Sequence, residues 1–180
     1  MKTLYVIAAS LLLSLSASAQ TFTLKSTDLQ GQATQKQVFN GFGCTGENRS
    51  PELHWENAPE GTKSFAVIMY DPDAPTGRGW THWVLFDLPA TTKEIKTGAG
   101  DITKLLLPKE AIQSTNDYGS YGYGGPCPPV GDKPHKYEIT VFALKTASLG
   151  LDKNTNPSIA GFYINSNTLA KTTITAYYNR

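Results

Sequence analysis

Two apolar runs, separated by a polar stretch rich in proline and glycine, most strongly constrain what this chain can fold into. Residues Ser64 to Tyr70 and Trp83 to Leu88 carry apolar side chains on both alternating faces. Short apolar runs bounded by turn residues are typical of strands that are covered on both sides. We therefore expect two central strands of a β core, joined by the intervening stretch.

That intervening stretch combines turn residues with groups that can bind a ligand. It contains Asp71-Pro-Asp-Ala-Pro75 and ends in His82-Trp83. Strand alternation groups Asp71 with Phe65, Val67 and Met69, and groups His82 with Val84, Phe86 and Leu88. An aspartate and a histidine at the ends of inward-facing rows predict a pocket with a polar floor at the rim of the core. A simpler interpretation is also compatible with these residues: the aspartates form turns, and His82 is a core histidine.

The rest of the chain adds further strands and one helical signal. Residues Tyr137 to Leu144 predict a third strong strand, with His135 in phase, and residues Thr172 to Tyr178 predict a final one. An N-cap asparagine followed by proline at residues 156–157 predicts a short helix to about residue 164. Residues 105–117 predict a loop followed by a short strand. The expected fold is mostly β, an antiparallel β-sandwich with one short helix near the C-terminus.

The beginning of the chain has the pattern of a secretory signal peptide. Lys2 precedes an apolar run, and small residues end at Ala19, near which we expect cleavage. Residues 20–180 are then expected to form a single domain, exported to the periplasm or out of the cell. The formal net charge is +1 and no Lys/Arg cluster is present, which argues against a nucleic-acid partner. No second hydrophobic segment predicts a transmembrane anchor.

The chain has two cysteines, both in the part that we expect to be exported. An even count in an oxidising compartment favours a disulfide between Cys44 and Cys127. On the chain-entropy model, closing so long a loop stabilises the fold by about 4–5 kcal/mol. Such a bridge would tie the glycine-rich turn at residues 41–46 to the loop that carries Pro128-Pro129. Two free thiols are the alternative.

A second stretch has the composition of a ligand-binding loop. Gly125-Pro-Cys-Pro-Pro129 is stiff, and His135-Lys-Tyr137 follows at the start of the third strong strand. Together with Asp71-Pro-Asp-Ala-Pro75 and His82-Trp83, these motifs resemble the two signatures of the phosphatidylethanolamine-binding protein family. The bacterial branch of that family is often called Raf kinase inhibitor-like. The resemblance covers nearly all of the chain after the leader.

The resemblance implies a β-sandwich with a small anion pocket at one end and no cofactor or metal. Carried over position by position, the ligand-binding residues are Asp71, Asp73, His82, Gly125, Pro129, His135 and Tyr137. The family's pocket takes phosphate, phosphorylethanolamine head groups or small carboxylates, and its bacterial branch suggests a homodimer. This chain departs from the family in having Lys136 where arginine is usual, a short loop at residues 76–80, and a C-terminal strand instead of a helix.

These observations predict an exported, non-catalytic protein that binds a small anion. We expect Asp71 to lie near His82 and to favour its charged form, so that the imidazolium, loop amides and the Tyr137 hydroxyl meet an anionic oxygen. One alternative is an inhibitor that binds a protease or kinase through the tyrosine-rich residues 118–124. A second is a metal-dependent hydrolase using His82, His135 and one aspartate.

Overall fold

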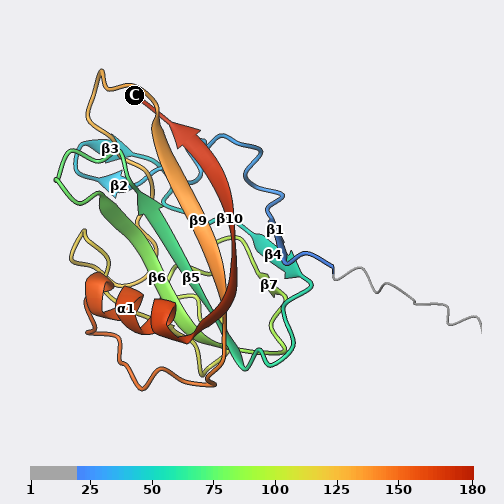
Figure 1. Ribbon diagram of the computed structural model, residues 1–180. Helices are drawn as coiled ribbons and strands as arrows, with labels where there is room; N and C mark the ends of the chain where they lie inside the picture. Colours follow the sequence, from blue (N-terminus) through green and yellow to red (C-terminus); the bar gives the residue numbers. More distant parts are fainter. Residues whose placement is uncertain (1–19) are drawn as a thin grey trace, which may run out of the picture.

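The computed structural model describes residues 20–180, so the predicted leader at residues 1–19 lies outside the described residues. Within residues 20–180 the chain forms ten strands and one helix (Figure 1). In chain order these are β1 (Thr23–Lys25), β2 (Asn40–Gly41), β3 (Cys44–Thr45), β4 (Leu53–Glu56), β5 (Ser64–Asp71), β6 (Trp80–Pro89), β7 (Glu94–Ile95), β8 (Ile112–Gln113), β9 (His135–Leu144), α1 (Pro157–Asn167) and β10 (Thr168–Tyr178). The fold is mostly β with one short helix, as the sequence predicts.

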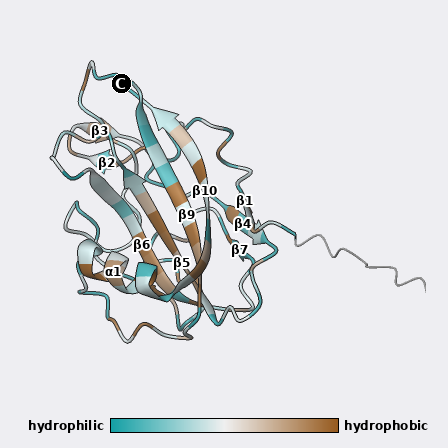
Figure 2. Ribbon diagram, viewed as in Figure 1, coloured by the Kyte–Doolittle hydropathy of each residue, from teal (hydrophilic) through white to brown (hydrophobic). Residues whose placement is uncertain are grey.

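The large sheet contains five antiparallel strands in the order β10-β9-β5-β6-β8. The two apolar runs at residues 64–70 and 83–88 form β5 and β6, which pair with each other inside this sheet. Every residue of β6 except its first and last is buried. Hydrophobic residues are concentrated along the middle of the large sheet (Figure 2), so this sheet is the scaffold on which other parts pack.

One face of the large sheet packs against a small antiparallel sheet with the order β1-β4-β7. The core between the two sheets includes Trp55 from the small sheet and Phe65, Trp83 and Ile139 from the large one. Trp83 is fully buried in this core, between the two sheets. The two layers and their shared core make the molecule an antiparallel β-sandwich.

The other face of the large sheet is covered by α1, which lies against the lower half of the strands in Figure 1. Ala160 and Ile164 of the helix pack there with Val84 and Phe86 of β6. The Asn156 side chain caps the helix by accepting the Ile159 N–H at 3.0 Å, as its sequence pattern predicts. The helix continues to Asn167, three residues beyond the predicted end, before the chain turns directly into β10.

Strand β6 contains two β-bulges that change which way its side chains point. Met69 and Tyr70 are consecutive on β5, yet they pair with Trp83 and Thr81, which leaves His82 as an extra residue. A second irregularity lies near Asp87, whose φ is +57°. The prediction that His82 shares a face with Val84, Phe86 and Leu88 is therefore wrong, because regular alternation does not hold across a bulge.

Candidate functional site

A cavity of about 270 Å³ lies at the end of the sandwich, where β5 ends and β6 and β9 begin. Its lining combines aromatic and proline side chains with a few polar ones. The lining residues are Phe42, Asp71, Ala74, Pro75, Thr76, Trp80, His82, Tyr118, Cys127, Pro128, Pro129, His135 and Tyr137. Five of the seven predicted ligand-binding residues are in this lining, whereas Asp73 and Gly125 are not.

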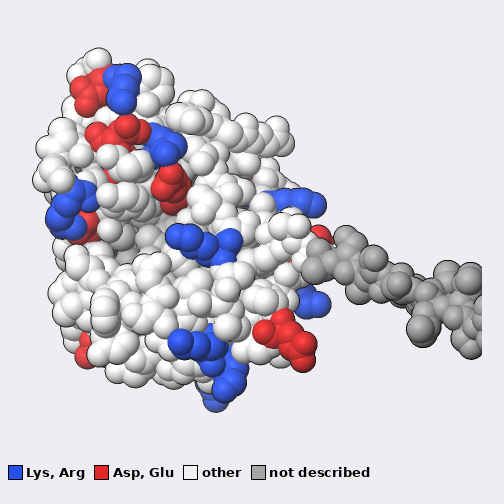
Figure 3. Space-filling view, in the orientation of Figure 1, with Lys and Arg blue, Asp and Glu red and all other residues white. Residues whose placement is uncertain are grey.

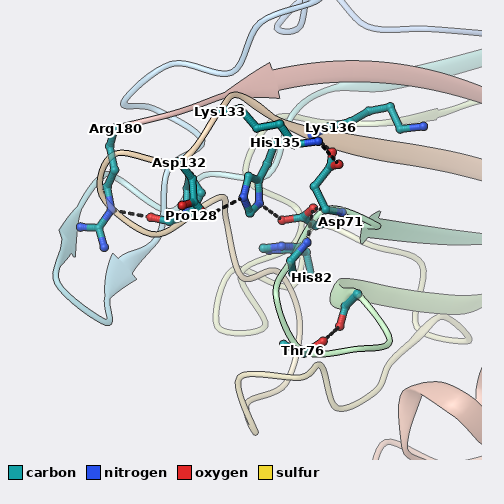
Figure 4. Close-up of polar contacts among 12 residues, drawn as sticks. Asp71, Thr76, His82, Pro128, Asp132, Lys133, His135, Lys136 and Arg180 are labelled. Carbon is teal, nitrogen blue, oxygen red and sulfur yellow. Dashed lines mark hydrogen bonds and ion pairs between the residues drawn. The ribbon is translucent and has the colours of Figure 1, made fainter.

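Asp71 is the last residue of β5 and is 3% exposed. Its Oδ1 accepts the N–H groups of Asp73 at 2.8 Å and of Ala74 at 3.1 Å, which fixes the turn after the strand. Its Oδ2 lies 2.8 Å from Nδ1 of His135, the first residue of β9. The carboxylate therefore holds the loop after β5 and the beginning of β9 in one arrangement, and Figure 4 shows it between the two histidine rings.

His135 has carboxylate oxygens beside both of its ring nitrogens. Nδ1 faces Asp71, and Nε2 lies 3.3 Å from Oδ2 of Asp132. Both ring nitrogens of His135 are thus in contact with carboxylate oxygens, and these two contacts fix the orientation of the ring in the cavity wall.

His82 is held differently from what the sequence predicts. Its Nδ1 is 2.7 Å from the carbonyl oxygen of Gly124 and 3.1 Å from that of Gly125, not hydrogen-bonded to Asp71. Burial lowers the pKa of His82 to about 4, although the two carbonyls and the Asp71 charge act in the opposite direction. The expectation of an imidazolium stabilised by Asp71 is therefore wrong for this histidine. Desolvation of the charged ring outweighs the favourable contacts.

Three buried polar atoms of the cavity lining have no hydrogen-bond partner in the described part of the chain. They are Nε2 of His82, the hydroxyl of Tyr137 and Nε1 of Trp80. Burial, with a smaller contribution from the Asp71 charge, raises the pKa of the Tyr137 hydroxyl, so it stays protonated as a donor. Because buried polar groups are almost always paired, three unpaired ones around one cavity indicate a place for a bound polar molecule.

Asp73 and Gly125 lie outside the cavity lining and form hydrogen bonds behind it. Asp73 accepts the Lys136 N–H at 2.9 Å and pairs with the Lys133 ammonium at 3.2 Å, contacts that lower its pKa. The Gly125 N–H donates to Oδ1 of Asn48 at 2.8 Å. Gly124 donates its own N–H to the His82 carbonyl. The expected anion-binding amides of these two glycines are therefore already in use.

The Cys44–Cys127 disulfide predicted from the cysteine count is present. It joins the β2–β3 hairpin to the loop that carries Pro128 and Pro129, and Figure 1 shows the hairpin at the same end of the sheet as the C-terminus. The Arg180 side chain reinforces this link (Figure 4), because it donates to the carbonyls of Pro128 at 2.6 Å and of Gly43 at 2.8 Å. One wall of the cavity is thus fixed by a covalent bond and by a bridging guanidinium.

Sequence reasoning missed three aromatic residues of the lining: Trp80 at the start of β6, and two that come from distant turns. Phe42 lies at the tip of the β2–β3 hairpin, and its ring packs edge-on to Tyr118 at 5.2 Å between centroids. Tyr118 also donates its hydroxyl to the Gly125 carbonyl at 3.0 Å. The prediction that residues 118–124 are exposed for protein binding is wrong at Tyr118, which faces the cavity, and at Tyr123, which is buried.

A larger cavity of about 530 Å³ lies along residues 99–113, away from the predicted motifs. Its lining is mainly apolar and includes the exposed side chains of Leu105 and Leu106. None of the unpaired buried polar atoms of residues 20–180 belongs to its lining. We therefore place the candidate site in the smaller cavity, which has convergent polar groups.

Comparison with known proteins agrees with the geometry. A family model described as phosphatidylethanolamine-binding protein matches residues 26–179. The UPF0098 protein YbcL of Escherichia coli K12 is 46% identical over 180 residues, covering 99% of this chain and 98% of that protein. The UPF0098 protein YbhB of the same organism is 41% identical over 158 residues, covering 87% of this chain and 99% of its own.

A solved structure supports the same conclusion at the level of the fold. The crystal structure of E. coli YbcL, described as a new member of the mammalian PEBP family, matches with a TM-score of 0.86 over 88% of this chain and 98% of that chain. The fold and cavity define a β-sandwich of the small-ligand-binding type. The chain belongs to the phosphatidylethanolamine-binding protein family.

Two further properties of residues 20–180 bear on the alternatives. No helix there is both long enough and apolar enough to cross a membrane. Across the same residues, no group of three or more histidine, cysteine, aspartate or glutamate side chains is arranged to hold a metal ion. The metal-dependent hydrolase that uses His82, His135 and one aspartate stays a prediction.

Proposed function

We propose that this protein is an exported binding protein for a small oxyanion, such as a phosphoryl group or a carboxylate, and that it binds without turnover. The observation that carries the proposal is the set of unpaired buried atoms in the cavity: the Tyr137 hydroxyl, Trp80 Nε1 and His82 Nε2. Tyrosine and tryptophan supply hydrogen-bond donors, which an anionic oxygen requires. Hydrogen bonds in which one partner is charged contribute roughly 1.5–3 kcal/mol each.

An anion can bind in the cavity even though the Asp71 carboxylate is part of its lining. Asp71 is already compensated by two backbone N–H groups and by His135. His135 lies in the cavity wall, and the remaining lining is mainly apolar. An apolar lining strengthens hydrogen bonds to an anionic ligand relative to those in water.

A non-catalytic role is supported by how the reactive side chains of the cavity are used. The Thr76 hydroxyl donates to the Gly79 carbonyl, and the proton-bearing nitrogen of His82 is hydrogen-bonded to backbone carbonyls. Cys127 is in the disulfide. Thus no hydroxyl or thiol nucleophile of the lining is paired with a base, which is the arrangement that nucleophilic catalysis needs.

The proposed location and partners rest on different features. A disulfide suits an oxidising compartment, and the signal-peptide pattern of residues 1–19 supports export. On the face drawn in Figure 3, Lys and Arg lie among Asp and Glu without forming a basic stripe. This distribution supports a small ligand over nucleic acid as the partner. The homodimer and the protease or kinase inhibitor stay predictions.

Calorimetry on the protein without its leader tests the proposal. Tyr137→Phe removes one unpaired donor, so we expect the affinity for inorganic phosphate or phosphorylethanolamine to fall roughly fivefold to a hundredfold. Tyr123→Phe is the matched control, because that buried hydroxyl donates to the Gln37 carbonyl outside the cavity. Equal effects of the two substitutions on affinity, or no binding of any oxyanion to the unsubstituted protein, would contradict the proposal.

A further inference from the structure

A third cavity, of about 330 Å³, lies at the opposite end of the sandwich from the candidate site. It is bordered by the start of β5 and by the turns that follow β4 and β6, at the end of the large sheet away from the C-terminus in Figure 1. Phe65 of β5 lines this cavity and Asp71 of β5 lines the other. At about 3.3 Å per residue, these two positions are about 20 Å apart along the strand. The two cavities are therefore separate places on the molecule.

The buried part of the third cavity's lining is aromatic and contains an unpaired hydrogen-bond donor. The rings of Trp55 and Phe65 lie 5.2 Å apart between centroids, and each residue is 2% exposed. Nε1 of Trp55 is buried and has no hydrogen-bond partner among residues 20–180. An indole N–H can only donate, and buried polar groups are almost always paired. We therefore expect a bound molecule to supply the missing acceptor.

The exposed part of the same lining carries one charge of each sign. Glu56 is the last residue of β4, Lys93 directly precedes β7, and both side chains are exposed. Neither side chain forms an ion pair with any other of residues 20–180. Both residues are tied to Trp55, which precedes Glu56 in the chain and donates its backbone N–H to the Lys93 carbonyl at 3.0 Å. A carboxylate, an ammonium group and a buried donor thus belong to one small cavity, each without a partner.

Hydrogen bonds hold both turns at the rim of the third cavity. The Thr92 N–H donates to the Pro89 carbonyl at 2.9 Å, which closes the turn after β6. Nδ2 of Asn57 donates to the Thr21 carbonyl at 3.2 Å, which ties the turn after β4 to the chain before β1. Small-molecule sites have volumes of roughly 300–1,000 Å³ and are usually preformed. The third cavity is at the small end of this range, so its size suits a small ligand.

We propose that the third cavity binds a free α-amino acid with an apolar side chain. The carboxylate of the amino acid pairs with the Lys93 ammonium and accepts the unpaired indole N–H, and its own ammonium pairs with Glu56. The side chain contacts the apolar lining, which consists of Phe65, Ala58 and Ala90. A molecule with only one of the two charges leaves either Lys93 or Glu56 without a partner, so the zwitterion is preferred. This binding does not depend on the function proposed for the cavity at the other end.

NMR titration of the protein without its leader with L-leucine, N-acetyl-L-leucine and L-leucinamide tests the proposal. L-leucine has both charges, whereas N-acetyl-L-leucine lacks the ammonium and L-leucinamide lacks the carboxylate. We expect L-leucine to bind roughly fivefold or more tightly than either derivative, because each derivative forms one ion pair fewer. Equal affinities for the three compounds, or no binding of L-leucine, would overturn the proposal.

The indole N–H signals in the same titration locate the bound molecule. The chain has three tryptophans, and the spectra of Trp55→Phe and Trp80→Phe assign two of their signals. We expect L-leucine to shift the Trp55 signal and to leave unchanged that of Trp80, which lines the other cavity. A shift at Trp80 alone, or at neither residue, would refute the proposed site.

Substitutions of the two exposed charges test their roles without removing any buried group. Lys93→Gln and Glu56→Gln should each weaken L-leucine binding roughly threefold or more. Lys93→Gln should also reduce the preference for L-leucine over L-leucinamide, and Glu56→Gln the preference over N-acetyl-L-leucine. Lys36→Gln is the matched control, because Lys36 is exposed and lines none of the three cavities. Unchanged affinity in both charge variants, or an equal loss in the control, would contradict the proposal.

Discussion

Oδ2 of Asp71 and Nδ1 of His135 lie 2.8 Å apart in a buried pair that joins the end of β5 to the start of β9. Both side chains are almost completely enclosed, and both line the candidate cavity. The two residues are 64 positions apart in the chain. Each belongs to one of the two motifs that carry the family resemblance, so this contact is where those motifs meet in the fold.

We expect Asp71→Asn to destabilise the protein by roughly 3–5 kcal/mol, because the substitution removes a buried carboxylate that accepts two backbone N–H groups and faces Nδ1 of His135. Chemical denaturation in phosphate-free buffer measures the effect. Asp132→Asn is the matched control: its carboxylate contacts the other nitrogen of His135 but is substantially exposed. That change should cost less than about 1 kcal/mol. Similar losses of stability in the two variants would contradict the expectation that the buried Asp71 contact contributes more than the exposed Asp132 contact.

The depressed pKa of His82 predicts an acid-dependent loss of stability. The folded pKa of about 4 is below the ordinary 6.5, so between these values the unfolded chain binds more protons than the folded protein. Stability due to this group is fully present above about pH 6.5 and decreases as pH falls toward 4. The separation of the two pKa values corresponds to roughly 3 kcal/mol.

Unfolding free energies of the unsubstituted protein and His82→Gln, measured from about pH 7 to pH 4, isolate this contribution. The remaining titratable groups are common to both proteins, so their difference in stability reports on His82. We expect the unsubstituted protein to lose roughly 3 kcal/mol more than the variant over this range. Parallel pH profiles would mean that the ring is not kept neutral by folding.

Gly125→Ala should be strongly destabilising although Gly125 is not part of the cavity lining. A Cβ at this position would be 1.9 Å from the Gln37 carbonyl oxygen and 2.8 Å from the Phe39 nitrogen. Backbone atoms cannot move aside easily, so we expect a loss of about 3 kcal/mol or more. Gly161→Ala in α1 is the control, because its Cβ would meet nothing within 4 Å. Unfolding by heat and by urea should show that Gly161→Ala raises the free energy of unfolding by about 1 kcal/mol.

Removing the disulfide should affect both stability and the cavity. Replacing Cys44 and Cys127 by serine opens a loop with a sequence separation of 83 residues, and the chain-entropy model gives a loss of about 4–5 kcal/mol. The loosened wall includes Phe42 and Pro128, so phosphate affinity should fall as well. A reductant should lower the unfolding midpoint of the unsubstituted protein and leave the double variant unchanged. Full phosphate affinity in a folded double variant would contradict the proposed role of the bridge.

The sequence predicts well those features that depend on local pattern. Apolar residues on both faces identified β5 and β6 as central strands, and Asn156-Pro157 located the start of α1. The orientation of His82 could not be predicted, since a bulge depends on how β6 pairs with β5. Phe42 and Tyr118 were missed because turns far apart in the chain bring them to the cavity. The charge state of His82 could not be predicted either, because it depends on the burial of the ring and on its carbonyl partners.

The bulge at His82 means that the site depends on the number of residues in β6 as well as on their identity. Because one extra residue turns His82 toward the cavity, deleting a single residue before Trp83 would restore regular alternation there. The sandwich core could keep its packing while the ring was carried away from Asp71 and Tyr137. Some family relatives would then have the same motif residues but a different spacing between β5 and Trp83. Such relatives would share the fold without sharing the ligand. A gap in a sequence alignment at this position therefore carries functional information.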